Sequence, residues 1–366
     1  MIKNNILIEF FREKNETIES KLNYLRHLNI NSKRSGDLII FKYDSDSDPK
    51  FDIQKICNGI IVDIVNLKIV CMSIPNEYNF ESFKNSIKFN DCVIEDNIEG
   101  SSVNVYYYNN IWNVSTKFSI NADETRFRNK KTFRQIFDSL FDLGKNNLDK
   151  RYTYNFLIDS SNKELYHIET TNNITGDIIN VNLGIKKPAV LYLKDRINNL
   201  NVSNYSELMK LVDSFPHDRK GIIIYSRDRL KRTSIISKEF IRKTDILDNQ
   251  GDIDFICLDS LFKKNNKELI LSYYPSYKEY FTEIECKLDN LVGKLHKLYV
   301  DVKCKKDTNT ITPLIYEKSI RKIHQMYMYK KSIHLGKQSK IKNNDIYDYL
   351  SSLDTKYLLY LINYGL

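Results

Sequence analysis

The chain has 366 residues, of which 42% are hydrophobic and 28% are charged. This composition is typical of a globular protein with a large core and room for two domains, and it excludes a disordered chain. No apolar run approaches the roughly 18 residues that cross a bilayer, and the start of the chain is too charged for a signal peptide. We therefore expect a soluble, cytoplasmic protein with no membrane partner.

The net charge of the chain and the spacing of its cysteines indicate which partners and which kinds of site to expect. The formal net charge is +9, which favours an anionic partner such as nucleic acid. Heavy use of Asn, Ile, Lys and Tyr is also typical of an AT-rich genome, which would account for part of the lysine excess. The six cysteines are widely spaced and include no C-x-x-C pair, so they indicate neither a zinc site nor a disulfide scaffold.

The first quarter of the chain predicts a helix followed by strands. Apolar residues near helical spacing favour an amphipathic helix over residues 6–28, and strands are expected at 38–43, 56–63 and 68–74. Between them, residues 44–49 carry aspartates at alternate positions. Pro49 and Lys55 stand where a calcium loop needs glycine and glutamate, so we expect a solvated loop and no metal site.

Residues 92–120 read as strand, turn and strand. The turn is Glu99-Gly100-Ser101-Ser102, and the β-branched and aromatic residues on each side of it favour a pleated surface. Asn109-Asn110 predicts a tight hairpin turn between residues 103–108 and 111–117. A catalytic or binding site could lie between these strands.

The middle of the chain continues with one helix and several strands. Apolar spacing predicts a helix over 126–143, and strands are expected at 152–159, 188–196 and 219–225. Two basic groups accompany these elements. They are Arg126-Arg128-Lys130-Lys131-Arg134 and Arg229-Lys231-Arg232-Lys238-Arg242-Lys243, and each would suit either a phosphate backbone or a solvated face.

From about Gly251 the apolar period changes to that of helices. Leu288, Leu291, Val292, Leu295 and Leu298 recur on one helix face, and residues 315–328 and 346–364 have similar apolar stripes. We therefore expect two domains, residues 1–250 with mixed strands and helices and residues 251–366 with helices alone.

Five of these segments, taken in order, resemble the nucleotide-binding core of ATP-dependent RNA ligases of the phage RNA ligase 1 type, in the nucleotidyltransferase superfamily. In that family a Lys-x-Asp-Gly-Ser turn carries the lysine that becomes adenylylated. Glu99, Gly100 and Ser101 match its last three positions, and Asn97 occupies the lysine slot. The resemblance implies an α+β fold, with a nucleotidyltransferase core of antiparallel sheets followed by an all-α C-terminal domain.

Nearly every family position that needs charge differs in this chain. An asparagine amide cannot replace the lysine, because its nitrogen lone pair is delocalised into the carbonyl. Glycines, one proline and one lysine of the pattern are retained, namely Gly59, Pro75, Gly100, Lys117 and Gly221. The changed slots are Asn58, Tyr78, Asn97, Leu157, Lys220, Ser234 and Ile236.

The leading interpretation is an RNA-ligase-like protein that has lost adenylyl transfer and acts as an RNA-binding or assembly protein. One alternative is an active RNA ligase, with ATP and magnesium as cofactors and its lysyl-adenylate on Lys117 or Lys220. Another alternative is a structural subunit of a viral complex. The expected partner is RNA, with tRNA or another structured RNA as a candidate.

The candidate site residues follow from this resemblance and from the basic groups. No catalytic residue is assigned, since the nucleophile slot is Asn97. The expected nucleotide-binding residues are Glu99, Gly100, Lys117 and Lys220. The expected RNA-binding residues are Arg126, Arg128, Lys131, Arg232 and Lys238.

Overall fold

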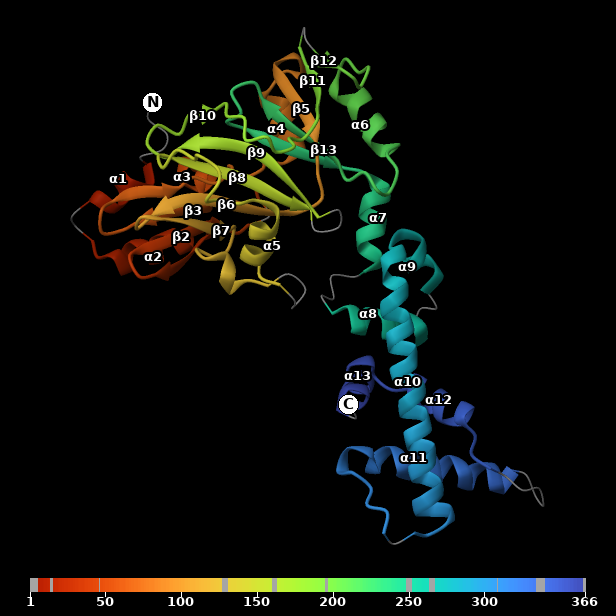
Figure 1. Ribbon diagram of the computed structural model, residues 1–366. Helices are drawn as coiled ribbons and strands as arrows, with labels where there is room; N and C mark the ends of the chain where they lie inside the picture. The colour runs from red at the N-terminus through yellow and green to blue at the C-terminus, as the bar shows by residue number, and fades with distance from the viewer. Residues whose placement is uncertain are drawn as a thin grey trace. The chain divides into compact units, whose positions relative to one another are not determined.

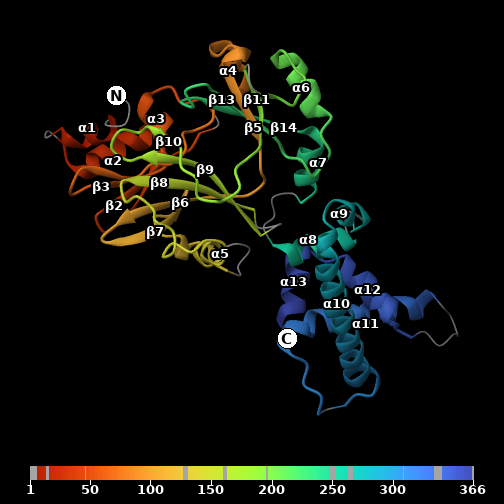
Figure 2. The ribbon, with the colours of Figure 1, turned by 45° about the horizontal axis from the view of Figure 1, so that its top comes forward.

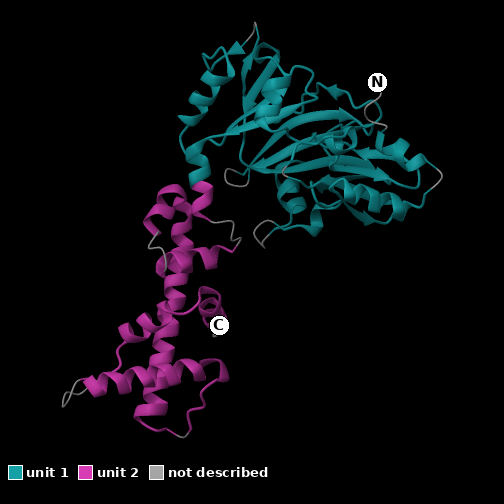
Figure 3. Cartoon of the chain, turned by 180° about the vertical axis from the view of Figure 1, so that it is seen from behind, with its two compact units in different colours: residues 1–242 teal, residues 243–366 magenta. Residues whose placement is uncertain are grey.

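The chain divides into two compact units in the computed structural model, Met1–Arg242 (unit 1) and Lys243–Leu366 (unit 2) (Figure 3). The structure describes residues 6–13, 16–45, 47–126, 131–159, 163–194, 197–247, 252–262, 267–307, 309–333 and 340–364. The domain boundary expected after residue 250 lies outside the described residues.

Unit 1 contains a four-stranded antiparallel sheet, the N-terminal sheet, in the order β1-β2-β3-β4. Figure 1 labels its two middle strands, β2 and β3. Its strands are β1 (Ile30–Ser35), β2 (Leu38–Tyr43), β3 (Asn58–Asp63) and β4 (Lys68–Cys71), with α3 (Asp52–Ile56) between β2 and β3. β2 and β3 are almost wholly buried, as their continuous apolar runs predict.

The helix predicted over residues 6–28 is two helices, α1 (Ile6–Arg12) and α2 (Ile18–His27). Thr17 caps the second helix by accepting a hydrogen bond from the amide of Ser20. The buried ammonium of Lys21 donates to the carbonyls of Phe10 and Phe11 at the end of α1. The predicted helix is therefore interrupted where Lys21 binds the carbonyls at the end of α1 and Thr17 binds an amide at the start of α2.

Two five-stranded sheets complete unit 1 (Figures 1 and 2). The central sheet has the order β10-β9-β8-β6-β7, with β6 (Ser101–Tyr108), β7 (Ile111–Thr116), β8 (Tyr152–Asp159), β9 (Glu164–Asn172) and β10 (Ile178–Ile179). The β5 sheet has the order β12-β11-β5-β13-β14, with β5 (Cys92–Asp96), β11 (Val190–Leu193), β12 (Ile197–Asn198), β13 (Gly221–Ser226) and β14 (Arg232–Ile236). All named strand pairs are antiparallel.

The helices of unit 1 cover the outer faces of these sheets. The apolar core of the β5 sheet includes Phe83 of α4 (Phe80–Ser86) and Leu208 and Val212 of α6 (Tyr205–Asp213). Phe137 of α5 (Phe133–Leu140) packs with Phe156 on the central sheet. α7 (Lys238–Ile246) follows β14 and contains the boundary between the two units.

α5 is shorter than the helix predicted over residues 126–143. Thr132 and Gln135 form a capping box, in which the threonine hydroxyl accepts from the Gln135 amide at 3.1 Å and the glutamine side chain accepts from the Thr132 amide at 3.0 Å. This cap begins the helix at Phe133. Arg126 and Lys131 therefore lie before the helix and not on its first turns.

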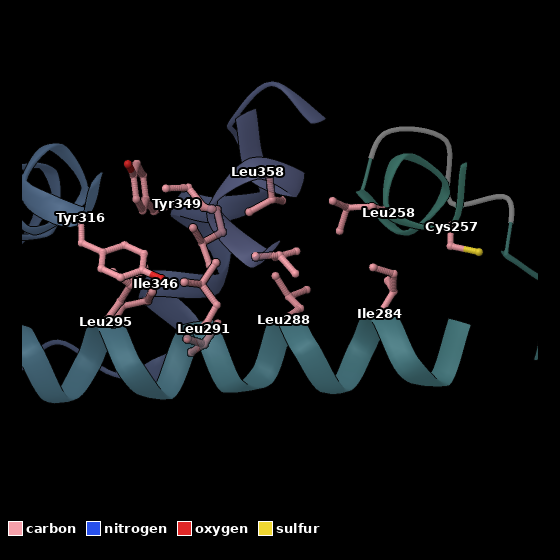
Figure 4. Close-up of a cluster of buried hydrophobic side chains, with 14 of the residues drawn as sticks. Cys257, Leu258, Ile284, Leu288, Leu291, Leu295, Tyr316, Ile346, Tyr349 and Leu358 are labelled. Atoms are coloured by element: carbon pink, nitrogen blue, oxygen red, sulfur yellow. The ribbon is translucent and has the colours of Figure 1, made fainter. Parts of the chain in front are cut away.

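Unit 2 is helical, with α10 (Lys278–Tyr299) at the centre of its core. The other helices are α8 (Ile253–Phe262), α9 (Lys267–Tyr273), α11 (Leu314–Ile333), α12 (Asn343–Ser351) and α13 (Thr355–Tyr364). Figure 4 shows Ile284, Leu288, Leu291 and Leu295 on one side of α10, pointing toward side chains of the neighbouring helices. The stripe predicted over residues 346–364 is divided between α12 and α13.

The predicted α+β class, with antiparallel sheets followed by a helical C-terminal region, is confirmed. Within the described ranges, the structure contains no helix both long enough and apolar enough to traverse a lipid bilayer.

Candidate functional site

The turn singled out in the sequence connects two different sheets. β5 belongs to the β5 sheet and β6 to the central sheet, so residues 97–100 cross from one to the other. Asn97 is buried, and its amide donates to the carbonyl of Gly221 at 3.1 Å. A Cβ on Gly100 would lie 2.5 Å from the carbonyl oxygen of Ile158, so only glycine lets the chain pass β8 this closely.

The position of Lys117 depends on how closely its backbone approaches the backbone of β3. It follows β7 in a turn in which the Thr116 amide donates to the carbonyl of Ser119. Gly59, with φ of +100°, faces it from β3, and a Cβ there would come within 3.1 Å of the Lys117 Cα. The retained glycine thus allows the N-terminal sheet to lie against the residue that carries the ammonium group.

Glu77 lies next to β14 and receives two of its side chains. The Tyr78 amide donates to the carbonyl of Arg232 at 2.8 Å, which fixes this segment beside the strand. Ser234 Oγ donates to Glu77 Oε2 at 2.7 Å, and Arg232 Nη2 lies 3.5 Å from Glu77 Oε1. The Glu77 carboxylate is 41% exposed, so it stands at the edge of the site and not in its interior.

The cations of Lys117, Lys220 and Arg232 interact electrostatically with one another and with the carboxylate of Glu77. We name these four residues the cationic cluster. Burial lowers the pKa of Lys117 to about 8, with further lowering by Arg232 and Lys220. Burial also lowers the pKa of Lys220, against the raising effect of Glu77 and Glu99. For Glu77, burial acts to raise the pKa, but Arg232, Ser234 and the two lysines outweigh it and the pKa is lowered.

The two lysines differ from Arg232 in how they are paired. Among the described residues, neither Lys117 nor Lys220 has an ion pair within 4.0 Å or a side-chain hydrogen bond. Both are partly buried. Two ammonium groups that have lost water without gaining a partner are suited to an anionic ligand.

A second charged network lies beside the cationic cluster. Arg229 Nη1 donates to Glu95 Oε1 at 2.7 Å, and its Nε lies 3.8 Å from Glu169 Oε2. The guanidinium also lies 4.0 Å from the ring centroid of Tyr225. Burial raises the pKa of Glu169, although Arg229 and Arg232 act to lower it. We name Glu95, Glu169 and Arg229 the Arg229 network.

The structure brings together some of the predicted nucleotide-binding residues. Lys117 and Lys220 share the cationic cluster, and Glu99 acts electrostatically on Lys220. Gly100 lets the backbone pass close to β8 as it crosses from the β5 sheet to the central sheet. Sequence reasoning did not single out Glu77, Glu95, Glu169 or Arg229 as site residues, and the only signal for them was a charged residue inside or beside a predicted strand.

Several changed family slots have structural partners in this chain. Asn58 donates through Nδ2 to the carbonyl of Ile74 at 2.7 Å. Ser234 binds Glu77, and Leu157 lies beside Gly100, where a Cβ would be 2.8 Å from a leucine methyl group. Arg232, Ser234 and Ile236 share one face of β14, so Arg232 supplies a cation on the face from which the family lysines are missing.

The predicted RNA-binding residues are in different environments. Arg126 and Lys131 are exposed, and Arg128 lies outside the described residues. Lys238 is exposed and paired with Asp213 at 2.5 Å. Arg232 is 8% exposed and paired with Glu77, so it cannot belong to an exposed basic surface. Arg232 is therefore buried beside Glu77, and its role in RNA binding stays a prediction.

The residues present fit phosphates better than a magnesium ion. Three cations of the cationic cluster could hold phosphate oxygens. Over the part of the chain that the structure describes, no three His, Cys, Asp or Glu side chains are grouped closely enough to hold a metal ion. A divalent cation arriving with a nucleotide would depend on Glu77 and Glu99 for protein ligands near the cationic cluster.

No family model matches the chain. It is 22% identical over 296 residues to the "Immediate-early protein ICP-46 homolog" of Invertebrate iridescent virus 6, which covers 69% of this chain and 63% of that protein. The chain thus spans less than two thirds of that viral relative.

Solved structures similar to this chain are ATP-dependent ligases. A putative ATP-dependent DNA ligase from Aquifex aeolicus has a TM-score of 0.43 at 10% identity, covering 76% of this chain and 81% of its own. An archaeal ATP-dependent RNA ligase has a TM-score of 0.45 at 9% identity, covering 75% and 74%. A Naegleria gruberi RNA ligase mutant with ATP and Mn has a TM-score of 0.32 at 13% identity, covering 46% and 56%. Because all three TM-scores lie below 0.5, we argue function from this chain's own side chains.

Proposed function

We propose that unit 1 is a ligase-related phosphate-binding module. It holds a phosphorylated ligand, either a nucleoside triphosphate or the phosphorylated end of an RNA, at the cationic cluster. It forms no covalent nucleotide bond at position 97. The observation that carries this proposal is the pair of partly buried, unpaired ammonium groups of Lys117 and Lys220 beside Arg232.

The physical basis is the cost of removing an ammonium group from water. Burial lowers the pKa of both lysines, which means that their charged forms lack compensation in the protein alone. A phosphate group supplies several acceptor oxygens and negative charge, so it offsets the lost hydration of both lysines at once. Asn97 can donate a hydrogen bond to such a ligand but cannot attack phosphorus.

The direct test is equilibrium binding of ATP, inorganic triphosphate and a 5′-phosphorylated oligoribonucleotide. Each of Lys117→Met and Lys220→Met should weaken binding by roughly tenfold or more, since each removes a charge-assisted hydrogen bond. Lys33→Met is the matched control, because that lysine is exposed and paired with Glu124 at 2.7 Å. Equal affinities in all four proteins would overturn the proposal.

A second candidate function is covalent transfer onto Lys117, favoured by its pKa of about 8. In that reaction the deprotonated Nζ would attack the α-phosphorus of ATP. An N–P bond would form, the P–O bond to the β-phosphate would break, pyrophosphate would leave, and the amine would release a proton to solvent. Incubation with α-labelled ATP and magnesium followed by a denaturing gel distinguishes the two functions.

We expect no labelled band from the wild-type protein. A band lost in Lys117→Ala and retained in Asn97→Ala would establish the covalent function instead. Asn97→Lys alone should not create activity, because the slots at Leu157, Ser234 and Ile236 still lack the family's charged groups and such groups act as a unit.

A further inference from the structure

Unit 1 contains a cavity of about 360 Å³ at the turn between β13 and β14. The phosphate site proposed above does not include this cavity. Its volume lies within the range of small-molecule sites, about 300–1,000 Å³. Of the family positions discussed above, the retained Pro75 and the changed Tyr78 line it. Lys117, Lys220 and Arg232 do not line it, so this cavity, which we name the hairpin cavity, is distinct from the cationic cluster.

The walls of the hairpin cavity are largely apolar. Met72, Pro75, Ile87, Ile178 and Leu230 contribute aliphatic surface, and Tyr78 contributes an aromatic ring. Ile178 and Leu230 are 38% and 49% exposed, which places them at the mouth. Such walls favour a ligand with a flat or apolar body.

Most of the charged groups that line the hairpin cavity are compensated by protein partners. Lys231 is the exception among the described residues: it has no ion pair, and its Nζ lies 5.7 Å from the ring centroid of Tyr78. Lys55 Nζ lies 2.6 Å from Asp52, and Arg229 is held by Glu95 at 2.7 Å. Asp228 accepts hydrogen bonds from Ser226 Oγ at 2.6 Å and from the Leu230 amide at 3.0 Å. Apart from Lys231, a ligand with its own net charge would find little unpaired charge to bind, so the lining favours an uncharged molecule.

Two buried polar atoms of the described lining residues make no hydrogen bond. Among the described residues, Ser73 Oγ and Arg229 Nε are buried without a hydrogen bond. A buried polar group left unsatisfied costs about 1–3 kcal/mol. Both belong to residues that line the hairpin cavity, together with the hydroxyl of Thr171. These groups offer hydrogen bonds to the polar edge of a ligand whose body packs on the aliphatic walls.

We propose that the hairpin cavity binds an uncharged planar heterocycle of nucleobase or nucleoside size. Its ring would pack between Tyr78 and the aliphatic walls, and its polar edge would reach Ser73, Thr171 and Arg229. The hairpin cavity acts independently of the cationic cluster.

The test is titration of the full-length protein with adenosine, guanosine, cytidine and uridine, followed by saturation-transfer NMR and calorimetry. At least one nucleoside should bind saturably. Leu230→Trp and Ile178→Trp, which enlarge side chains at the mouth, should abolish that binding. Ser73→Ala should weaken it by roughly fivefold to tenfold, the equivalent of one hydrogen bond. Ile111→Trp, at the exposed turn between β6 and β7, is the matched control and should leave binding unchanged.

Further variants separate this proposal from the proposed function. Lys220→Met should weaken triphosphate binding and leave nucleoside binding unchanged, whereas Leu230→Trp should do the reverse. Absence of binding by all four nucleosides to the folded wild-type protein would overturn the hairpin cavity proposal. Displacement of a bound nucleoside by inorganic triphosphate would also overturn it, because triphosphate has no heterocycle and would place the nucleoside in the cationic cluster.

Discussion

The interior of unit 2 and the charged interior of unit 1 differ in what they bury. In unit 2, Ile284, Leu288, Leu291 and Leu295 of α10 pack with apolar residues of the surrounding helices. In unit 1, the Arg229 network places a guanidinium and two carboxylates in the interior, beside a cluster with two unpaired ammonium groups. Apolar burial stabilises wherever it is well packed, whereas buried charge is costly unless it is paired, so a ligand is expected at the unpaired ammonium groups of the cationic cluster.

The largest expected effect comes from breaking the Arg229 network. Arg229→Ala should lower the free energy of unfolding by about 3–5 kcal/mol, because Glu95 and Glu169 would be left buried without their cation. Chemical denaturation measures this change. Arg227→Ala, at an exposed position two residues earlier, is the control and should change stability little.

A triple substitution in the Arg229 network tests whether its buried charges can be replaced by uncharged side chains like those inside unit 2. Replacing all its charges together, in Arg229→Met with Glu95→Gln and Glu169→Gln, should recover much of the lost stability, because no uncompensated charge remains. A loss of less than about 1 kcal/mol in Arg229→Ala would instead show that water compensates the carboxylates, as it does for ion pairs on a protein surface.

In unit 2, truncation of an apolar side chain should have a similar but more variable cost. Leu288→Ala should lower the free energy of unfolding by about 2–5 kcal/mol, since the side chain is 1% exposed and its removal leaves a cavity. Leu269→Ala, at a position 44% exposed, is the matched control. Equal small effects of both changes would mean that α10 is not packed as described.

Lys117 should show a pH dependence whose sign distinguishes its two candidate roles. Its pKa falls from 10.5 to about 8 in the folded protein, so its charge opposes folding below pH 8, and stability should rise as the pH increases from about 8 to 10.5. Binding of inorganic triphosphate should weaken over the same range, because the folded protein loses the ammonium charge. Covalent transfer onto Lys117 would instead accelerate as the pH rises through 8.

Lys117→Met is the control for this pH profile. It should remove the part of the pH dependence of triphosphate binding that comes from the titration of Lys117, and it should raise the free energy of unfolding at neutral pH by about 1–3 kcal/mol by removing a desolvated charge. A wild-type affinity that stays constant from pH 7 to 10 would contradict a role for Lys117 in binding phosphate.

The smallest expected effect concerns the exposed basic residues before α5. Reversing Arg126 and Lys131 together to glutamate should weaken binding of single-stranded RNA and reduce the slope of log affinity against log salt by about two. Stability should change little, since both side chains are exposed. An unchanged slope would indicate that the net charge of +9 is dispersed and does not form a binding surface.

Much of the fold was predictable because its signals are local. The apolar stripe over residues 288–295 predicted the buried face of α10, and Asn109-Asn110 predicted the hairpin between β6 and β7, where both asparagines have positive φ. The helix expected over residues 126–143 was too long, because its start depends on the capping box of Thr132 and Gln135, which the apolar pattern did not indicate.

The candidate site was only partly predictable. The sequence by itself determined that position 97 has no nucleophilic amine and that Lys117 and Lys220 are present. It could not determine that they share one cluster, because they are far apart along the chain and reach different sheets.

Only the tertiary structure turned Arg232 inward onto Glu77, joined β5 and β6 across two sheets, and enclosed the hairpin cavity. Periodicity is a property of neighbouring residues, whereas burial, unpaired charge and cavities arise from contacts between distant segments.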